Sequence, residues 1–251
     1  MNLLNYGGNK IKYFDLGDPG KQILGSGPYQ YFFYKLLANE KLEINDLGSL
    51  TVYIFSKDQA ANVLVQGISE LLESGDCIQL EGLPLSLSTN GGDVSILIAG
   101  TSNLSNQSTS ISFMRHQELY KVIKPWGHEL WLNGQHSNYA IKEIYIKAGT
   151  KTSLQYHNFK QETNVLFKGT AKLHFKSSSD VSNDAVTLDH IESIPINAYC
   201  SIDVVPRTLH RIEAISDILL YETSTPHLDD VVRVMDDSNR NHGRLATEHL
   251  N

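Results

Sequence analysis

Four polar side chains in the second half of the chain have the types and spacing of a metal site. Gln155 and His157 lie two residues apart, Glu162 follows His157, and His210 comes on a later predicted strand. In a β-strand, residues two apart point to the same face, so Gln155 and His157 share a face if their segment is extended. All ten histidines occur from His116 onward, so an imidazole-based site can form only in this half.

The ligand types indicate a class of metal ion. Two imidazole nitrogens, one carboxylate oxygen and one amide oxygen, without a thiolate, suit one divalent cation of borderline softness: Zn, Mn, Fe, Ni or Co. Four protein ligands leave coordination positions for water or substrate if the ion is five- or six-coordinate. The alternative is a hydrogen-bonded polar cluster without an ion.

The elements that must position these side chains are strands. Runs of β-branched and aromatic residues, separated by Gly, Asn, Asp and Pro, recur from end to end. They predict strands at residues 29–33, 50–55, 63–65, 85–88, 94–99, 139–146, 163–167, 170–175, 185–188, 201–205 and 218–222. Helical spacing occurs only at 34–41 and 228–235, where chance can produce it. Many short strands at close spacing predict an all-β sandwich or barrel.

Two copies of one barrel fit the order of these strands. The polar stretch 100–110 interrupts the strand pattern and predicts a connection. We therefore expect one barrel at 1–112 and a second, metal-binding barrel at 113–251. Because the first half contains no set of residues resembling a metal site, we expect its barrel to be degenerate, with a role in packing, dimer formation or covering the active-site mouth.

Composition excludes several classes of partner. The formal net charge is -7 and no Lys/Arg cluster occurs in either half, so nucleic acid and anionic membranes are poor candidates. No apolar run approaches the about 20 residues of a membrane span, and residues 1–9 lack the pattern of a secretory signal. Cys77 and Cys200 are too few for a disulfide framework. We expect a soluble cytoplasmic protein with two buried thiols.

Residues 120–240 resemble the cupin superfamily, and most closely the type II phosphomannose isomerases and related sugar-phosphate isomerases. The resemblance implies a bicupin fold of two jelly-roll barrels, also called double-stranded β-helices. It also implies that Gln155, His157, Glu162 and His210 are the metal ligands. The resembling segments are Lys124–Trp131, 141–144, 153–162, 167–171, 205–206, 209–211, 228–233 and 236–237.

At the level of reaction, the resemblance implies interconversion of a phosphorylated aldose and ketose through an enediol. Such a reaction needs a base near the migrating proton, for which Lys142, Glu213 and Glu222 are available. We favour Lys142, because it shares a predicted strand face with Ile144 and Ile146. The alternative is that Lys142 and Glu222 lie on a solvated strand face or form an internal ion pair.

The phosphate of such a substrate needs positive charge. Arg211, Lys160, Arg233 and Arg240 are candidates by type, because guanidinium groups match phosphate oxygens. We place Arg211 with Lys142 and Glu222 as catalytic, and the other three as substrate-binding. The alternative for the arginines is plain surface charge.

Four further side chains in this half have structural interpretations. His128 and His174 are lone histidines among apolar neighbours, so we expect satisfied imidazoles rather than ligands. Trp126 and Trp131 are expected to pack in the core or at the barrel lid, with stacking on a sugar face as the alternative.

Several positions differ from the isomerase pattern. Lys160 and Thr163 stand where those enzymes usually have Arg and His, and Ser238 and Asn239 stand where they have Tyr and Gly. These differences leave three hypotheses open. The first is a sugar-phosphate isomerase, with a sugar or sugar phosphate as its small-molecule partner and a second copy of the chain, in a homodimer, as its candidate protein partner. The others are another metal-dependent cupin enzyme, such as an oxygenase or epimerase, and a non-catalytic sugar-binding module.

Overall fold

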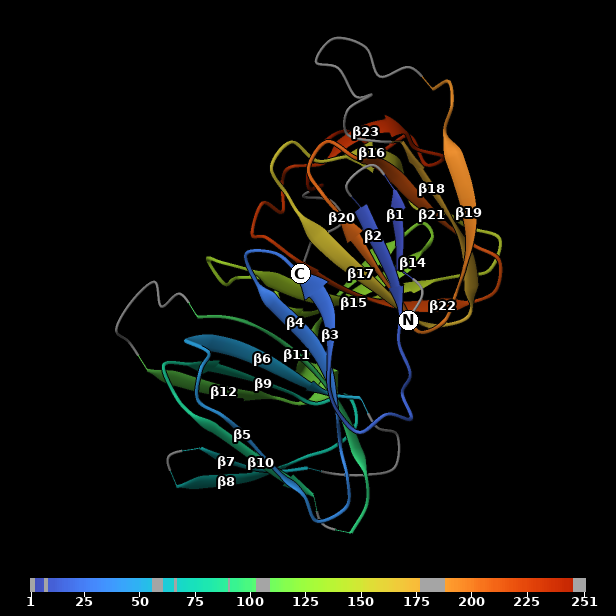
Figure 1. The fold of residues 1–251 in the computed structure, drawn as a ribbon. Helices are drawn as coiled ribbons and strands as arrows, with labels where there is room; N and C mark the ends of the chain where they lie inside the picture. The colour runs from blue at the N-terminus through green and yellow to red at the C-terminus, as the bar shows by residue number, and fades with distance from the viewer. Residues whose placement is uncertain are drawn as a thin grey trace. The chain divides into compact units, whose positions relative to one another are not determined.

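The described backbone is built almost wholly of antiparallel strands (Figure 1). The computed structural model describes residues 3–6, 9–55, 61–65, 67–89, 91–102, 109–176 and 188–245. Within those ranges the one helical segment is the short 3₁₀ turn η1 (His116–Glu118). The prediction of an all-β fold is therefore confirmed, and the described residues include no helix able to span a membrane.

The chain divides into two compact units. The N-terminal barrel comprises the described parts of residues 15–120 and 132–141, and the C-terminal barrel those of 1–14, 121–131 and 142–251. This division differs from the predicted boundary after residue 112. Residues 9–13 belong to the C-terminal barrel because their strand pairs with residues 200–202, and residues 132–141 form part of the N-terminal barrel.

The N-terminal barrel consists of a six-stranded and a four-stranded sheet. The larger has the order β12-β9-β6-β11-β4-β3 and the smaller the order β5-β10-β7-β8. Its strands are β3 (Gly20–Ser26), β4 (Gln30–Leu36), β5 (Lys41–Ile44), β6 (Ser49–Ile54), β7 (Ala61–Val65), β8 (Ile68–Leu72), β9 (Cys77–Glu81), β10 (Leu85–Thr89), β11 (Val94–Thr101) and β12 (Ser110–Met114).

The C-terminal barrel consists of an eight-stranded and a five-stranded sheet. Their orders are β1-β2-β20-β17-β22-β15-β14-β13 and β19-β18-β21-β16-β23. The strands are β1 (Leu3–Tyr6), β2 (Asn9–Tyr13), β13 (Tyr120–Lys124), β14 (Gly127–Asn133), β15 (Ala140–Ile146), β16 (Leu154–Tyr156), β17 (Glu162–Lys168), β18 (Thr170–Lys176), β19 (Glu192–Asn197), β20 (Cys200–Val204), β21 (Leu209–Ala214), β22 (Ile218–Ser224) and β23 (Val232–Met235).

The predicted strands coincide with observed ones, with one exception. The segment predicted at 185–188 lies largely outside the described residues, and Leu188 is not in a strand. The two segments with helical spacing are not helical, since 34–36 ends β4 and 232–235 is β23. The polar connection at 100–110 is shorter than expected, because β11 runs to Thr101 and β12 begins at Ser110.

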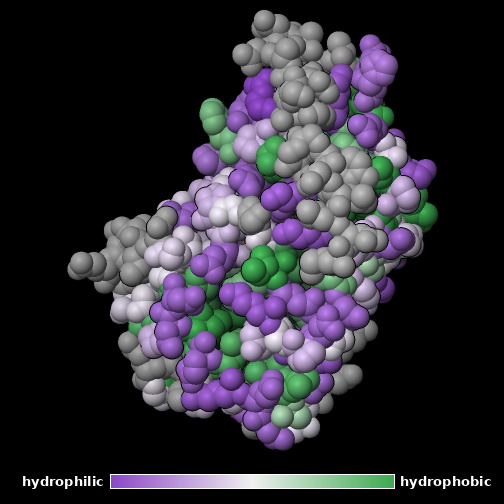
Figure 2. All heavy atoms as spheres, in the orientation of Figure 1, coloured by the Kyte–Doolittle hydropathy of each residue, from purple (hydrophilic) through white to green (hydrophobic). Residues whose placement is uncertain are grey.

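Each barrel buries an apolar core between its two sheets. Alternate residues of a strand face inward, so β6 contributes Leu50, Val52 and Ile54 to the N-terminal core. In the C-terminal barrel, Leu166 of β17 and Ile212 of β21 face a common core from different sheets. On the face shown in Figure 2, hydrophilic residues cover much of the surface and hydrophobic ones lie in smaller groups between them. This distribution is what inward-facing apolar residues require.

Candidate metal centre

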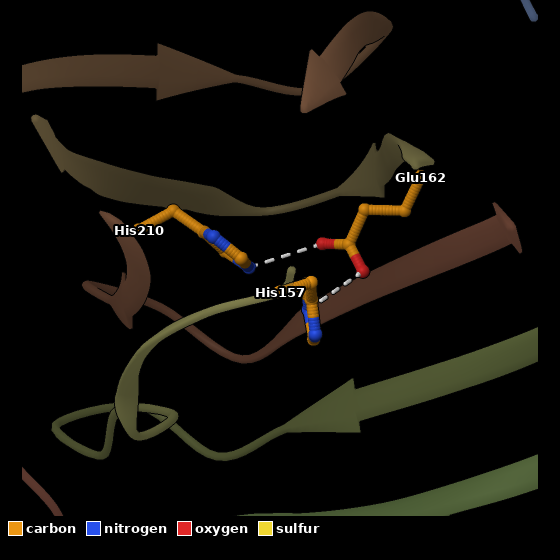
Figure 3. Close-up of side chains that lie close together, drawn as sticks. All are labelled: His157, Glu162 and His210. Atoms are coloured by element: carbon orange, nitrogen blue, oxygen red, sulfur yellow. Dashed lines mark ion pairs between the residues drawn. The ribbon is translucent and has the colours of Figure 1, made fainter. Parts of the chain in front are cut away.

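The structure brings three of the four predicted ligands together inside the C-terminal barrel (Figure 3). Glu162 Oε1 lies 3.1 Å from His210 Nε2, and Glu162 Oε2 lies 3.5 Å from His157 Nε2. One ligand atom from each residue can be chosen so that all three fall within 4.8 Å of one another, and all three residues are buried. Within the described residues this is the one such group of His, Cys, Asp and Glu.

Strand pairing explains why these side chains converge. His210 lies near the start of β21, Glu162 begins β17, and His157 directly follows β16. Gln155 of β16 pairs with His210 of β21, and residues directly opposite in an antiparallel pair present their side chains to the same face. Gln155 lines the same cavity, where its Oε1 accepts a hydrogen bond from Ser153 Oγ at 2.6 Å. Its role as a fourth ligand stays a prediction.

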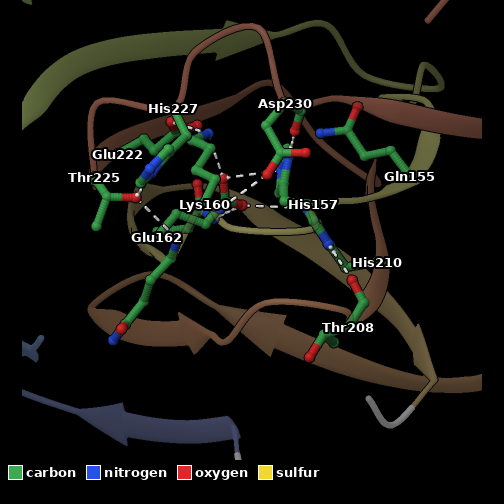
Figure 4. A network of polar contacts seen from close by, with 12 residues as sticks. Gln155, His157, Lys160, Glu162, Thr208, His210, Glu222, Thr225, His227 and Asp230 are labelled. Carbon is green, nitrogen blue, oxygen red and sulfur yellow. Dashed lines mark hydrogen bonds and ion pairs between the residues drawn. The ribbon is translucent and has the colours of Figure 1, made fainter. Parts of the chain in front are cut away.

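Asp230 holds the loop that carries His157 (Figure 4). Its carboxylate accepts hydrogen bonds from the backbone N–H groups of Asn158, Phe159 and Lys160 at 3.0, 2.6 and 3.0 Å. Burial alone raises the pKa of Asp230, but these donors outweigh it and lower that pKa. The carboxylate is therefore ionised and fixes the loop.

The imidazole of His157 is in the state that a metal ligand requires. Its Nδ1 lies within hydrogen-bonding distance of the Asp230 carbonyl oxygen, so Nδ1–H is the donor and the lone pair is on Nε2. Burial, with Lys160 nearby, lowers the pKa of His157 and favours the neutral ring. His157 Nε2 is a buried atom without a hydrogen-bond partner among the described residues. A cation would satisfy it.

Glu162 and His210 complete a donor set that fits a divalent metal. Burial raises the pKa of Glu162, but Lys160 and His210 lower it far more, so the carboxylate is ionised. His210 Nδ1 donates to the Thr208 carbonyl oxygen at 3.0 Å, which directs Nε2 toward Glu162. Two imidazole nitrogens and a carboxylate suit the predicted ions, Zn, Mn, Fe, Ni or Co. The orphaned His157 nitrogen supports this fit.

Lys160 is a buried counter-ion and not a residue of the cavity mouth. It is 4% exposed, and its Nζ lies 2.6 Å from Glu162 Oε2 and 2.7 Å from Glu222 Oε1. Burial alone lowers the pKa of Lys160, but the two carboxylates outweigh it and raise that pKa. The predicted phosphate-binding role is therefore not supported by its position, because both carboxylates already occupy the ammonium group.

Lys142 and Glu222 both line the cavity and form the internal ion pair that was the alternative to a catalytic role, which stays a prediction. Lys142 Nζ lies 3.3 Å from Glu222 Oε1 and 3.9 Å from Glu129 Oε1. Burial raises the pKa of Glu222, but Lys142 and Lys160 outweigh it and lower that pKa. The result is a chain of alternating charges, which we call the charge chain: Glu162, Lys160, Glu222, Lys142, Glu129 and Lys124.

The predicted arginines divide into two groups. Arg211 is not among the cavity residues: it follows His210 on β21 and so points to the opposite face, where it donates to the Met235 carbonyl at 3.1 Å. Its predicted catalytic role is therefore not supported. Arg233 and Arg240 do line the cavity, and both pair with Asp236, at 3.6 and 2.7 Å.

The lone histidines and the two tryptophans have the structural roles expected of them, whereas the candidate base Glu213 is not among the cavity residues. Glu213, the third possible base, lies outside the cavity and accepts a hydrogen bond from His174 at 2.7 Å. His128 stacks on Tyr145 with ring centroids 5.2 Å apart. Trp126 packs in the core and also lines the cavity, where Trp131 lies 5.2 Å from Lys142 Nζ.

Sequence reasoning assigned no role to three residues that serve this site. Asn164 Nδ2 donates to Glu162 Oε1 at 2.9 Å, Glu129 lies between Lys142 and Lys124 in the charge chain, and Asp230 orients His157. Asn164 could be found by spacing, because a residue two positions after Glu162 on a strand shares its face. Glu129 likewise lies two positions before Trp131. Nothing local to Asp230 indicates a partner more than 70 residues earlier.

The cavity wall carries an excess of positive charge. Its basic side chains are Lys124, Lys142, Lys160, Arg233, Arg240 and Arg244. These six face four carboxylates, namely Glu129, Glu162 and Glu222 of the wall and Asp236 beside it, so the excess is two positive charges. The whole chain, in contrast, has a net charge of -7. The cavity volume of about 110 Å³ holds several water molecules, since one needs roughly 10–15 Å³.

A family model confirms the sequence resemblance. Residues 111–236, half of the chain, match the model described as mannose-6-phosphate isomerase C-terminal. The chain belongs to this family. The match includes β13 to β23, and with them every residue of the His157, Glu162 and His210 cluster. No curated protein matches the chain by sequence.

Solved structures place this member of the mannose-6-phosphate isomerase C-terminal family among the bicupins. The chain is similar to protein YlbA of E. coli, with a TM-score of 0.65 and 12% identity over 88% of this chain and 92% of that one. Oxalate decarboxylase of Lactobacillus farciminis matches with a TM-score of 0.63 and 11% identity, over 93% and 86% of the two chains. These likenesses show the fold, and the bicupin prediction is confirmed.

A third structural neighbour is described with a metal. Bacillus subtilis oxalate decarboxylase, whose structure is described in terms of its Mn(II) centres, matches with a TM-score of 0.58 and 12% identity, over 90% of this chain and 74% of that one. Because only 12% of the residues are identical, this likeness shows a shared fold and nothing further about this chain.

Proposed function

We propose that this protein is a metal-dependent isomerase that interconverts a phosphorylated aldose and ketose. The observation that carries the proposal is the cluster of His157, Glu162 and His210, in which a buried imidazole nitrogen has no hydrogen-bond partner within the described residues. Membership of the mannose-6-phosphate isomerase C-terminal family supports the substrate class. The excess positive charge of the cavity wall supports an anionic substrate.

The cluster would hold the metal through His157 Nε2, His210 Nε2 and Glu162, with Gln155 as the proposed fourth ligand. A bound divalent ion would act as a Lewis acid that stabilises negative charge on the substrate oxygens. Other side chains then have to move a proton between neighbouring carbons. Glu222 is ionised and lies 3.3 Å from Lys142 Nζ, so the pair can accept a proton and return it.

The surroundings of this pair keep it in place. Lys160 holds Glu222 from one side and Glu129 attracts Lys142 from the other, so neither group needs to reorient during proton transfer. Trp131 covers Lys142 with its ring and restricts access of water.

Solvent exchange tests the proposal directly. Protein loaded with Mn or Zn is incubated with mannose 6-phosphate in deuterated water, and we expect fructose 6-phosphate with deuterium at the carbon that exchanges its proton. Glu222→Gln should lower kcat by about 100-fold or more, the range typical of a positioned base. The matched control is Glu213→Gln, which removes a carboxylate outside the cavity.

A loaded site that exchanges no solvent deuterium into any phosphorylated sugar would contradict the proposal. Ligand-induced stabilisation without product would then indicate the non-catalytic sugar-binding module. Oxygen consumption with bound iron would indicate a different cupin enzyme.

A further inference from the structure

We propose that Arg244 binds the anionic group of the ligand and that Arg233 is the residue that positions it. The inference deepens the proposed function and rests on it for the sugar, whereas the binding of an anion can be tested separately. The chemical class is a phosphate or carboxylate group on a small polar molecule. Such a group binds most strongly to a cation of the cavity wall that is not already paired with a carboxylate.

Five of the six basic side chains of the wall are paired with the four carboxylates. Lys160 lies between Glu162 and Glu222, Lys142 between Glu222 and Glu129, and Lys124 lies 3.7 Å from Glu129. Arg233 and Arg240 share the carboxylate of Asp236, and both side chains are 9% exposed. A cation that is already paired with a carboxylate gains less from a ligand anion than a solvated one.

Arg244 differs from these five. It lines the cavity, its side chain is exposed, and it has no hydrogen bond or ion pair among the described residues. A guanidinium group can grip phosphate or carboxylate oxygens with two parallel hydrogen bonds. Arg244 is therefore the side chain of the wall that is available to an incoming anion.

Arg233 holds the segment that carries Arg244. We call residues 240–245 the C-terminal strap. Arg233 Nη1 donates to the carbonyl oxygens of Asn241 and Gly243, the latter at 2.8 Å, and its backbone N–H donates to His242 Nδ1 at 3.0 Å. Gly243 N–H donates to the Val231 carbonyl at 2.7 Å, with a positive φ of 74° that suits glycine. In this proposal Arg233 acts on the ligand through the strap, and its predicted role as a substrate-binding residue stays a prediction.

Calorimetric titration of the metal-loaded protein tests the anion site. The probes are inorganic phosphate, fructose 6-phosphate, glucuronate and neutral fructose, so that phosphate and carboxylate recognition are distinguished. Arg244→Gln should weaken binding of the preferred anion by about 10- to 100-fold, as expected for a lost charged hydrogen bond, and leave metal content unchanged. Lys172→Gln, which removes an exposed lysine of β18, is the matched control and should bind as the parent does.

Two results would overturn the inference: none of the three anions binds the parent protein, or Arg244→Gln binds them as tightly as the parent. If Arg244→Gln loses sugar-phosphate affinity but the parent shows no turnover, the anion site stands and the isomerase proposal fails. If turnover occurs and the variant is unaffected, the isomerase stands and the anion site fails.

Limited digestion with trypsin tests the positioning role of Arg233. Arg233→Met should speed cleavage after Arg240 and weaken phosphate binding about as much as Arg244→Gln does. Arg211→Gln, which alters a nearby arginine that does not contact the strap, should leave both readouts unchanged. A strap that stays protected in Arg233→Met, with unaltered phosphate affinity, would contradict this role.

Discussion

The two barrels share an alternating backbone and fill it with different side chains. On β6, a central strand of the N-terminal barrel, the inward positions are Leu50, Val52 and Ile54. On β17, a central strand of the C-terminal barrel, the series Glu162, Asn164 and Leu166 begins with two polar residues and ends with an apolar one. The C-terminal barrel therefore has an apolar core and a polar cavity, whereas the inward positions of β6 in the N-terminal barrel are all hydrophobic.

The difference shows what a polar interior requires. Buried charges are tolerated when each has an opposite partner, and the charge chain of the C-terminal barrel provides one for every member. His157 Nε2 is the exception within the cluster, since it has no hydrogen-bond partner in the part of the chain that the structure describes. The contrast between the barrels can be tested by moving charge into the first and removing charge from the second.

A charge placed in the N-terminal core should have the largest effect. Ile96 of β11 is 1% exposed and surrounded by apolar side chains, so Ile96→Glu leaves a buried carboxylate without a partner. We expect the free energy of unfolding to fall by about 3–5 kcal/mol, measured by chemical denaturation. Ser95→Glu, on the other face of the same strand, is the control and should cost far less. Equal stability of the two variants would show that this core can neutralise a charge.

Removing the central cation of the charge chain should have the next largest effect. Lys160→Met leaves Glu162 and Glu222 facing each other without the ammonium group, which should destabilise the metal-free protein by about 3 kcal/mol. Added Mn or Zn should restore more stability to this variant than to the parent, because the ion neutralises Glu162. Lys168→Met, at the exposed end of β17, is the control. If metal stabilises both variants equally, Lys160 and the ion do not share a counter-charge.

Loss of one imidazole ligand should mainly affect the metal. His157→Gln should lower metal affinity by at least about 100-fold, the upper end of the loss seen when only a supporting partner is removed. The measurement is metal content by elemental analysis together with competitive titration. His174→Gln removes a histidine that pairs with Glu213 outside the cavity, and it should retain full occupancy. Unchanged affinity in His157→Gln would refute the proposed site.

The smallest effect should come from changing Gln155, and it shows whether the protein supplies three metal ligands or four. Gln155→Met keeps the size of the side chain but removes its amide, and it should lower metal affinity about tenfold if the amide oxygen is a ligand. Ser153→Ala removes only the hydroxyl that donates to Gln155, so its effect should be smaller. If Gln155→Met binds metal as the parent does, the protein contributes only His157, Glu162 and His210.

Much of the site followed from the alternation of strand residues. The alternation that joins Gln155 with His157 also separates Arg211 from its neighbour His210. The prediction of a catalytic role for Arg211 therefore disagrees with the alternation. Lys160 lies just before β17, where alternation makes no prediction. The alternation could not indicate Asp230, whose partners at 157–160 are distant in the sequence.

The fold was predicted better than its division into units. Strands rich in β-branched and aromatic residues were found, whereas β2 (NKIKY) and β14 (GHELWLN) were missed because polar residues interrupt their apolar ones. Local composition predicts that a segment is a strand but not which distant strand it joins. For that reason the pairing of β2 with β20, which assigns the first strands to the C-terminal barrel, could not be read from the sequence.

The pairing of β2 with β20 affects how the chain folds during translation. Ile11 pairs with Ile202, so β2 leaves the ribosome about 190 residues before its partner. By then the described strands of the N-terminal barrel have all been synthesised. The hairpin of β1 and β2, in contrast, has no neighbouring strand until β20 is synthesised. Contacts of such long sequence separation form slowly, and an open strand edge attracts other chains in the meantime. Chaperone dependence and aggregation of nascent protein should therefore arise at this hairpin rather than at the metal centre.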